Sequence, residues 1–578
     1  MNRRAALRRI GLLMAGAAVL PAIGGCVAAT QASGPAFGAA RPNIVLILFD
    51  DTGYSDFGCY GAEIRTPHID ALAAAGLRYN RFDTRAICSP TRAALLTGRN
   101  SHSVGMKDLA AGEGGRAEKR EGVDGILASD AQMLPDALRR AGYFTMASGK
   151  WHLSPSWENG APSNNAAMPL NRGFDYFYGF LGGWQDQYKP NLYEGNQPIG
   201  QPDDPNYHFS GAIVDKAIAQ LDQRDPAKPF FLYLSLGATH SPVQVPAAYI
   251  DRYKGIYEHG WEVIQQERLE RQKRLGLIPA DTQLPPPDPK DRPWFSLTED
   301  ERIVYARYMA AYAGFLEHAD EQIGRLIAAL KAEGSYENTL FVVASDNGPS
   351  SEGGETGSID RLYPPIPANA AELVNNLDRI GKAHIAVQTP WTIVSATPFR
   401  RYKSWPYLGG QRAPLVLSWG SRFAAGAIRT QAIDEIDLAP TLAEVAGARF
   451  ETQIDGVQQQ PVAGRSIVPT FDAANAPDPR PIQYFELRGN RAIRVGNWRA
   501  VAVHRQGEDF EKDEWKLFDL SKDFNETTDL SERFPEKLAE LKAQWMVQAT
   551  QYEVLPLGEG PAYMRRFNPY GDEFSPRP

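Results

Sequence analysis

Four apolar runs that end in polar residues constrain the fold of this chain more than any other feature. They cover residues 43–49 (NIVLILF), 143–148 (YFTMAS), 230–237 (FFLYLSLG) and 339–345 (TLFVVAS). Short, continuous apolar runs are typical of strands that are buried on both faces, and such strands occur mainly in parallel sheets. The sequence therefore predicts a sheet that is covered on both sides.

Helix-like stretches alternate with these runs. They lie at residues 90–96, 131–141, 209–223 and 297–333. This alternation predicts an α/β fold with a large, mostly parallel central sheet flanked by helices. Ligands of such sheets bind beyond the carboxyl ends of the strands, so we expect an active site where the polar residues follow the runs.

The composition of the chain changes after residue 447. Short strand-like runs at 482–487, 492–495 and 499–503 precede a helix near 536–550. We therefore expect three parts: an export signal and flexible segment at 1–40, a catalytic domain at 41–447, and a smaller C-terminal α+β domain at 448–578.

Two segments interrupt the alternating pattern. Residues 261–294 are polar, charged and rich in proline, which predicts a protruding arm or lid over the site. Residues 350–394 are irregular, and we expect them to line the cleft, although they carry no motif that we can assign.

The first residues have the pattern of a sorting signal. Arg3 and Arg4 begin a basic segment, an apolar run covers 10–23, and Gly24-Gly25-Cys26 follows. This order indicates a secretory signal, and it resembles a twin-arginine signal that ends in a bacterial lipobox. We expect an exported protein, either periplasmic or anchored to the membrane by a lipid on Cys26, and both alternatives stay open.

The charge of the chain excludes one class of partner. Lys and Arg number 61 against 69 Asp and Glu, which gives a net charge of −8, and no basic stripe is present. Nucleic acid is therefore not an expected partner. With only three cysteines the chain is also not a disulfide scaffold.

The sequence Cys88-Ser89-Pro90-Thr91-Arg92 carries the strongest chemical signal. We expect a helix with Ser89 as its N-cap, Pro90 at its first position and Gly98 at its end. Cys88 would then lie at the positive end of a helix, where anions bind, and Arg92 would reach the same anion.

Cys88 has two simpler interpretations. It could be a partly buried free cysteine before an ordinary helix, which is the default for a single cysteine. It could also be the thiolate of a phosphatase, since a helix N-terminus lowers the pKa of a thiol. The three residues between Cys88 and Arg92 are fewer than that chemistry uses, which argues against the phosphatase.

The full run CSPTRAALLTGR resembles the formylglycine motif of the type I sulfatases, which belong to the alkaline phosphatase superfamily. Further segments fit the same resemblance, in the order RPN (41–43), GKWH (149–152), RGFD (172–175), SDNG (345–348) and DLAPTL (437–442). The similarity extends from about Arg41 to beyond Leu530 and is closest to bacterial arylsulfatases.

The resemblance implies a reaction and its cofactors. A maturation enzyme would oxidise Cys88 to Cα-formylglycine. A small-molecule sulfate ester, with an aryl sulfate as the expected substrate, would be hydrolysed through a covalent sulfated formylglycine. The implied catalytic residues are Cys88, Arg92, Lys150, His152, His240 and Lys403. One Ca²⁺ per chain would be held by Asp50, Asp51, Cys88, Asp346 and Asn347, most of which offer the hard oxygen ligands that Ca²⁺ prefers.

The resemblance also implies separate roles for these side chains. Arg92, Lys150 and Lys403 would hold the sulfate oxygens. His152 would remove a proton from the hydrated aldehyde, and His240 would protonate the leaving group.

Three alternative functions remain open at this point. A phosphonate monoester or phosphodiester hydrolase would use the same formylglycine site. A two-metal alkaline phosphatase would normally have Ser or Thr in place of Cys88. A surface lipoprotein could bind sulfated ligands without catalysis if Cys88 stayed a thiol.

The leaving-group side departs from the family pattern. Tyr407-Leu408 precede Gly409-Gly410, where the family often has an acidic residue or a histidine. The exact substrate is therefore open. Trp184, Tyr188 and Trp405 are candidate aromatics for an aryl pocket, although aromatic residues more often belong to a core.

Overall fold

The computed structural model describes residues 41–110, 125–155, 166–288, 290–362 and 365–560. These residues belong to one compact unit. The predicted export signal and Cys26 lie outside the described residues. The predicted boundary between residues 447 and 448 stays a prediction.

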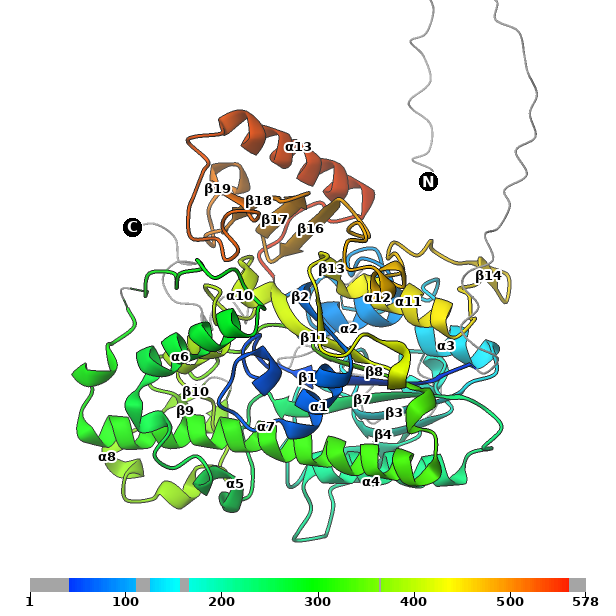
Figure 1. Ribbon diagram of the computed structural model, residues 1–578, viewed down its shortest axis with the longest axis horizontal. Helices are drawn as coiled ribbons and strands as arrows, with labels where there is room; N and C mark the ends of the chain where they lie inside the picture. Colours follow the sequence, from blue (N-terminus) through cyan, green and yellow to red (C-terminus); the bar gives the residue numbers. More distant parts are fainter. Residues whose placement is uncertain (1–40, 111–124, 156–165, 289, 363–364, 561–578) are drawn as a thin grey trace, which may run out of the picture. The chain divides into compact units, whose positions relative to one another are not determined.

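An eleven-stranded sheet forms the centre of the fold (Figure 1). Its order is β12 (Ala427–Arg429), β2 (Leu77–Asp83), β11 (Arg412–Ser418), β8 (Thr339–Ser345), β1 (Asn43–Asp50), β7 (Phe230–Thr239), β3 (Phe144–Lys150), β4 (Tyr176–Phe180), β5 (Leu192–Glu194) and β6 (Gln197–Gly200), with β13 (Ile433–Asp434) beside β2. The five strands from β8 to β4 are parallel to one another, and β11 is antiparallel to both of its neighbours. The predicted mostly parallel sheet is therefore confirmed.

The apolar runs explain the middle of this sheet. Every residue of β1, β7 and β8 is buried. Helices cover both faces, which is why these strands read as continuous rather than alternating apolar sequence. The carboxyl ends of the parallel strands consequently meet at one edge.

Two groups of helices cover the sheet. One face carries α1 (Pro67–Ala75), α4 (Phe209–Gln223), α5 (Ala247–Asp251) and the long α7 (Glu299–Glu333), and α7 contacts the other three. The other face carries α2 (Cys88–Thr97), α3 (Leu134–Arg140) and α11 (Leu438–Val445). A capping box between Thr298 and Glu301 fixes the start of α7.

Residues 261–294 do not form a protruding lid, so that prediction is wrong. The segment contains α6 (Trp261–Arg274), which packs on α9 (Thr389–Ser395). Arg268 is fully buried and donates to Asp56 and Glu63, while Trp261 makes an edge contact with Trp391. Arg268 of α6 thus faces buried carboxylates, while Glu262, Gln266, Glu267 and Arg274 face solvent, and composition alone could not distinguish the two groups.

Residues 350–394 contain short regular elements between loops. They are β9 (Ser358–Leu362), β10 (Pro365–Pro367), α8 (Ala370–Leu373) and α9. Further short elements follow, namely α10 (Leu408–Gln411), β14 (Gln453–Ile454), β15 (Val457–Gln458) and α12 (Pro469–Asp472).

A second sheet forms the C-terminal part (Figure 1). Its four antiparallel strands are β16 (Ile482–Leu487), β17 (Asn490–Val495), β18 (Trp498–Ala502) and β19 (Trp515–Asp519). One face packs on α13 (Pro535–Gln551) through Trp545, and the other face contributes Phe485 to a core cluster that includes Ile87. The predicted smaller α+β region is confirmed, and it supports the residue directly before Cys88.

No helix among the described residues is long and apolar enough to cross a membrane.

Candidate active site

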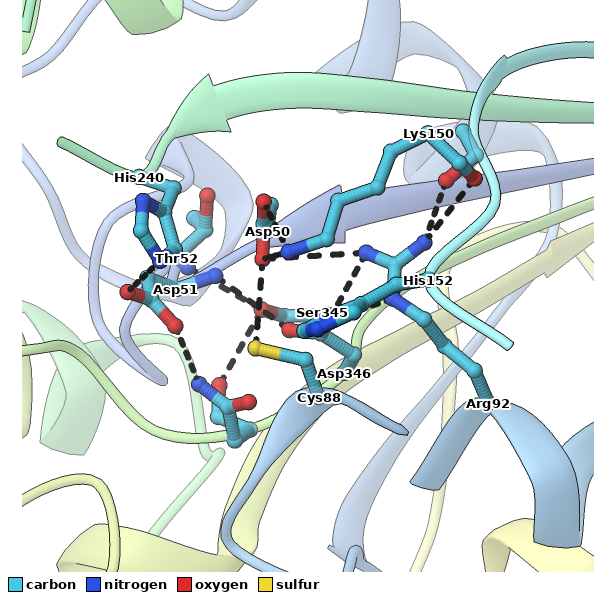
Figure 2. A network of polar contacts seen from close by, with 12 residues as sticks. Asp50, Asp51, Thr52, Cys88, Arg92, Lys150, His152, His240, Ser345 and Asp346 are labelled. Carbon is cyan, nitrogen blue, oxygen red and sulfur yellow. Dashed lines mark hydrogen bonds and ion pairs between the residues drawn. The ribbon is translucent and has the colours of Figure 1, made fainter. Parts of the chain in front are cut away.

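Four parallel strands deliver polar side chains to one point (Figure 2). Asp50 ends β1 and Asp51 follows it, Lys150 ends β3, His240 follows β7, and Asp346 and Asn347 follow β8. All of these side chains are buried. The convergence expected from the strand ends is therefore present in the structure.

The backbone at this edge is unusual in two places. Asp51 and His152 have φ values of 60° and 59°, in the left-handed region that residues other than glycine rarely occupy. Such conformations cost free energy and concentrate at functional sites. Both positions lie in segments that carry predicted catalytic or metal-binding residues.

Two glycines allow neighbouring backbone segments of the site to approach closely. A Cβ on Gly149 would lie 1.8 Å from the carbonyl oxygen of Ser235, and a Cβ on Gly348 would lie 1.9 Å from that of Gly409. Only glycine fits at such distances. These contacts explain why glycine precedes Lys150 and why glycine follows Asn347.

Cys88 is the first residue of α2 and not the residue before its cap. The N-cap is Ile87, and the first helical hydrogen bond runs from Thr91 N to the Ile87 carbonyl at 3.2 Å. The prediction that Ser89 is the N-cap is wrong, because its hydroxyl donates to the carbonyl of His152 at 2.9 Å. Pro90 is the third helical residue, which is tolerated because the first four N–H groups of a helix need no helical partner. Gly98 ends the helix with φ 65°, as predicted.

The thiol of Cys88 faces the carboxylate of Asp50. Its Sγ lies 3.7 Å from Asp50 Oδ1, and the side chain is buried. Burial raises the pKa of the Cys88 thiol well above its ordinary value. An unmodified thiolate nucleophile is accordingly disfavoured at this position.

Three carboxylates form ion pairs with three cations. Lys150 Nζ lies 2.7 Å from Asp50 Oδ2, and Arg92 Nη2 lies 2.7 Å from Asp346 Oδ2. Lys403 Nζ lies 2.9 Å from Asp51 Oδ2. Burial alone would lower the pKa of Lys150, but the combined attraction of Asp50, Cys88 and Asp346 outweighs it and raises that pKa. The six groups form a charge-balanced cluster around the thiol.

The two histidines lie in different surroundings. His240 Nε2 is 3.6 Å from Asp51 Oδ2, on the side of Lys403. His152 lies close to Cys88 and Arg92 in Figure 2. Its main-chain carbonyl accepts the Ser89 hydroxyl at 2.9 Å.

The donor atoms fit a hard cation. One ligand atom each from Asp50, Asp51, Cys88 and His240 lie within 4.8 Å of one another. Asn347 Oδ1 is buried and has no hydrogen-bond partner among the described residues, although its amide Nδ2 donates to Asp51 Oδ1 at 2.6 Å. A buried acceptor without a donor requires an explanation, and a cation supplies one. The cluster could therefore bind a metal ion, and carboxylate and amide oxygens are the ligand type that hard cations prefer.

Glu352 also belongs to this site, and the sequence did not reveal it. Its Oε1 lies 3.3 Å from Lys403 Nζ and 3.8 Å from His240 Nε2. The residue comes from the irregular segment 350–394. The only available signal was its closeness in sequence to Asp346 and Asn347.

Comparison with protein-family profiles shows which family this chain belongs to. The profile named sulfatase matches residues 42–448, which is more than half of the chain. The chain belongs to the sulfatase family. A second profile, for the C-terminal part of N-sulphoglucosamine sulphohydrolase, matches residues 401–552 of this sulfatase.

Curated relatives align with most of the length of this sulfatase. An uncharacterised sulfatase of Schizosaccharomyces pombe is 33% identical over 546 residues, which cover 89% of this chain and 94% of the relative. An arylsulfatase of Klebsiella aerogenes is 30% identical over 467 residues, which cover 77% of this chain and 92% of the relative. Sulfate esters are therefore the supported substrate class.

Solved structures confirm the fold of the sulfatase. The structure of Ps i-CgsB in complex with k-i-k-neocarrahexaose matches with a TM-score of 0.64 and 23% identity, over 93% of this chain and 99% of that one. A phosphonate monoester hydrolase from Silicibacter pomeroyi matches with a TM-score of 0.55 and 18% identity, over 89% and 96%. The chain thus has the alkaline phosphatase-like fold, which both kinds of enzyme share.

The structure brings the predicted site residues of this sulfatase together. They are Asp50, Asp51, Cys88, Arg92, Lys150, His152, His240, Asp346, Asn347 and Lys403. Their individual roles stay predictions. Trp405 does not line a pocket, because it is fully buried and packs on Tyr402.

Proposed function

We propose that this sulfatase hydrolyses aryl sulfates through a formylglycine that a maturation enzyme makes from Cys88, with one Ca²⁺ per chain. The observation that carries the proposal is the position of Cys88. It begins α2 and faces Asp50, inside a cluster of three carboxylates and three cations. Formylglycine, once formed, supplies a hydrated aldehyde whose hydroxyl is the nucleophile.

Charge balance supports a divalent cation in the proposed mechanism. Asp50, Asp51 and Asp346 already neutralise Lys150, Lys403 and Arg92, and Glu352 adds a fourth carboxylate, so a bound sulfate would be an unbalanced anion. Asp50, Asp51, Asp346 and Asn347 would hold Ca²⁺, which contributes positive charge next to the sulfate. Some N–H groups of Lys150, Arg92 and Lys403 would then donate to the sulfate oxygens.

The two histidines provide proton transfer on opposite sides of the nucleophile. His152, which follows β3 and is tied to α2 through Ser89, would accept the proton of the second hydroxyl and so expel sulfate. His240, beside Lys403, would protonate the departing oxygen. Separate histidines for the two steps are consistent with the different surroundings described above.

An aryl leaving group is supported by two observations. The arylsulfatase of Klebsiella aerogenes covers most of this chain. Trp184 is 37% exposed and lies on the loop after β4, three residues beyond Leu181, whose carbonyl accepts the backbone N–H of His152 at 3.0 Å. An exposed aromatic ring near the catalytic segment suits a planar leaving group.

The test of this proposal compares matched nitrophenyl sulfate, phosphate and phosphonate esters on the purified protein. We expect the largest kcat/KM for the sulfate, and we expect Cys88→Ala to abolish turnover of all three. Faster turnover of the phosphonate would instead support the hydrolase that shares this fold. Faster turnover of alkyl or sugar sulfates than of aryl sulfates would contradict the aryl assignment alone.

A further inference from the structure

We propose that Glu352 is a positioning residue that fixes Lys403 and His240 on the leaving-group side of the site. The inference rests on the proposed function, because it concerns how the proton donor of that reaction is held. Glu352 touches no reacting atom in this account and acts through its two neighbours.

The contacts of Glu352 place it between the two donors. Oε1 of Glu352 lies 3.3 Å from Lys403 Nζ and 3.8 Å from His240 Nε2. Its side chain is only 13% exposed. A carboxylate this well buried holds its partners more tightly than a solvated one, because screening by water is weak there.

Asp51 competes for the same two donors. Asp51 Oδ2 lies 2.9 Å from Lys403 Nζ and 3.6 Å from His240 Nε2. Asp51 is also a predicted metal ligand, and its Oδ1 already accepts from Asn347. A cation on Asp51 would weaken its hold on Lys403 and His240. Glu352 would then be the carboxylate that keeps both donors in place.

The loop that carries Glu352 is fixed on both sides of this residue. The backbone N–H of Lys403 donates to the carbonyl of Pro349 at 3.0 Å. A Cβ on Gly353 would lie 2.2 Å from the carbonyl oxygen of Val387, so the loop approaches that segment as closely as glycine permits. The hydroxyl of Thr392, in α9, donates to the carbonyl of Ser350 at 2.8 Å. The backbone that carries Glu352 is therefore held in one position and is hydrogen-bonded to the backbone of Lys403.

This arrangement addresses the departure of the sequence from the family pattern. Tyr407 and Leu408 stand where an acidic residue or a histidine is usual, so these two positions offer neither a carboxylate nor an imidazole to the leaving-group side. Glu352 supplies a carboxylate to that side from another loop.

The experiment uses Glu352→Gln, which keeps the shape of the side chain and removes its charge. Glu355→Gln is the matched control, because Glu355 is an exposed glutamate of the same loop. Both variants and the wild type are assayed on a series of aryl sulfates of increasing phenol pKa, and thermal unfolding is recorded for each. We expect Glu352→Gln to lose about 10²-fold in kcat on the most basic leaving groups, the loss that a small misplacement can cause, and little on nitrophenyl sulfate. Glu355→Gln should match the wild type throughout.

Double-mutant cycles show whether Glu352 acts through its neighbours. If it does, Glu352→Gln should cost little more in a His240→Ala or Lys403→Ala background, because the interacting pair is already broken. Equal losses on every ester, or full additivity with both partners, would overturn the proposal. If Glu352→Gln lowers the unfolding temperature, rescue of the leaving-group dependence by Glu352→Asp separates positioning from folding, and its absence counts against the proposal. Failure of the wild type to hydrolyse any sulfate would instead refute the proposed function.

Discussion

His240 and His152 lie on different sides of Cys88 (Figure 2), and their proposed roles predict different kinetic defects. Proton donation matters most for a strongly basic leaving oxygen, so His240→Ala should slow unactivated aryl sulfates by roughly 10²–10⁴-fold and nitrophenyl sulfate much less. His152→Ala should slow sulfate release equally for all esters. The measurement is the dependence of kcat/KM and kcat on leaving-group pKa. A His240→Ala variant with the same dependence as the wild type would remove His240 from this role, and Lys403 would be the next candidate.

The buried oxygen of Asn347 and the neighbouring carboxylates predict a stabilising metal. Asp51→Ala and Asp346→Ala should lose bound Ca²⁺ and activity, since each removes one oxygen ligand. They should also lose the rise in unfolding temperature that added Ca²⁺ gives the wild type, because a ligand stabilises only the folded state that binds it. Asp360→Ala, at an exposed aspartate, is the control. Full activity of chelated, metal-free protein would show that the ligand assignment is wrong.

At the scale of elements, the parallel strands of the site were predictable and the supporting ones were not. The sequence predicts β1 and β8 because they are unbroken apolar runs. By contrast, β2 (LRYNRFD) mixes buried and partly exposed positions, and the register it forms with β11 depends on the tertiary fold.

The site residues also fall into those that the sequence predicts and those that it does not. Asp50, Lys150 and Asp346 could be predicted, since a strand end fixes where they lie. Glu352 could not, because it lies on an irregular loop whose position is set by the packing of Gly353 on Val387. Ser89 was assigned to the wrong role because its partner, the carbonyl of His152, is remote in sequence.

The helix α6 provides a test of packing at this scale. Arg268 is buried and pairs with Asp56 and Glu63, while Glu63 also pairs with Arg271. Arg268→Met should therefore leave the buried Asp56 without an ion pair and cost about 3–5 kcal/mol of unfolding free energy. Lys273→Met, which removes the partner of the partly exposed Glu270, should cost about 1 kcal/mol or less. Denaturant unfolding of both variants gives the two values. A small effect of Arg268→Met would restore the interpretation of this segment as a loosely attached lid.

At the scale of the whole molecule, the C-terminal sheet contributes to the site without supplying a catalytic group that we assign. Phe485 of β16 shares a core cluster with Ile87, the residue before Cys88, and Tyr407, which precedes the glycines that Gly348 approaches. The charge of the whole chain, −8, would repel a sulfate ester at long range, so the local cations of the site must overcome it.

The location of the molecule depends on Cys26, outside the described residues. If Cys26 carries a lipid, Cys26→Ser should move the protein from the membrane fraction to the soluble fraction, because an acyl anchor contributes about 0.8 kcal/mol per buried CH₂. Fractionation of cells that express each form, followed by immunoblotting, makes the comparison. The same distribution for both forms would favour a periplasmic protein without an anchor.

The mass of the peptide that contains position 88 tests the central claim most directly. The protein is purified from a host that contains the maturation enzyme, digested, and measured with and without an aldehyde-trapping reagent. The account predicts a peptide in which CHO replaces the CH₂SH of Cys88 and which gains the mass of the reagent. A Cys88 that remains entirely a thiol in protein that still hydrolyses sulfate esters would contradict it.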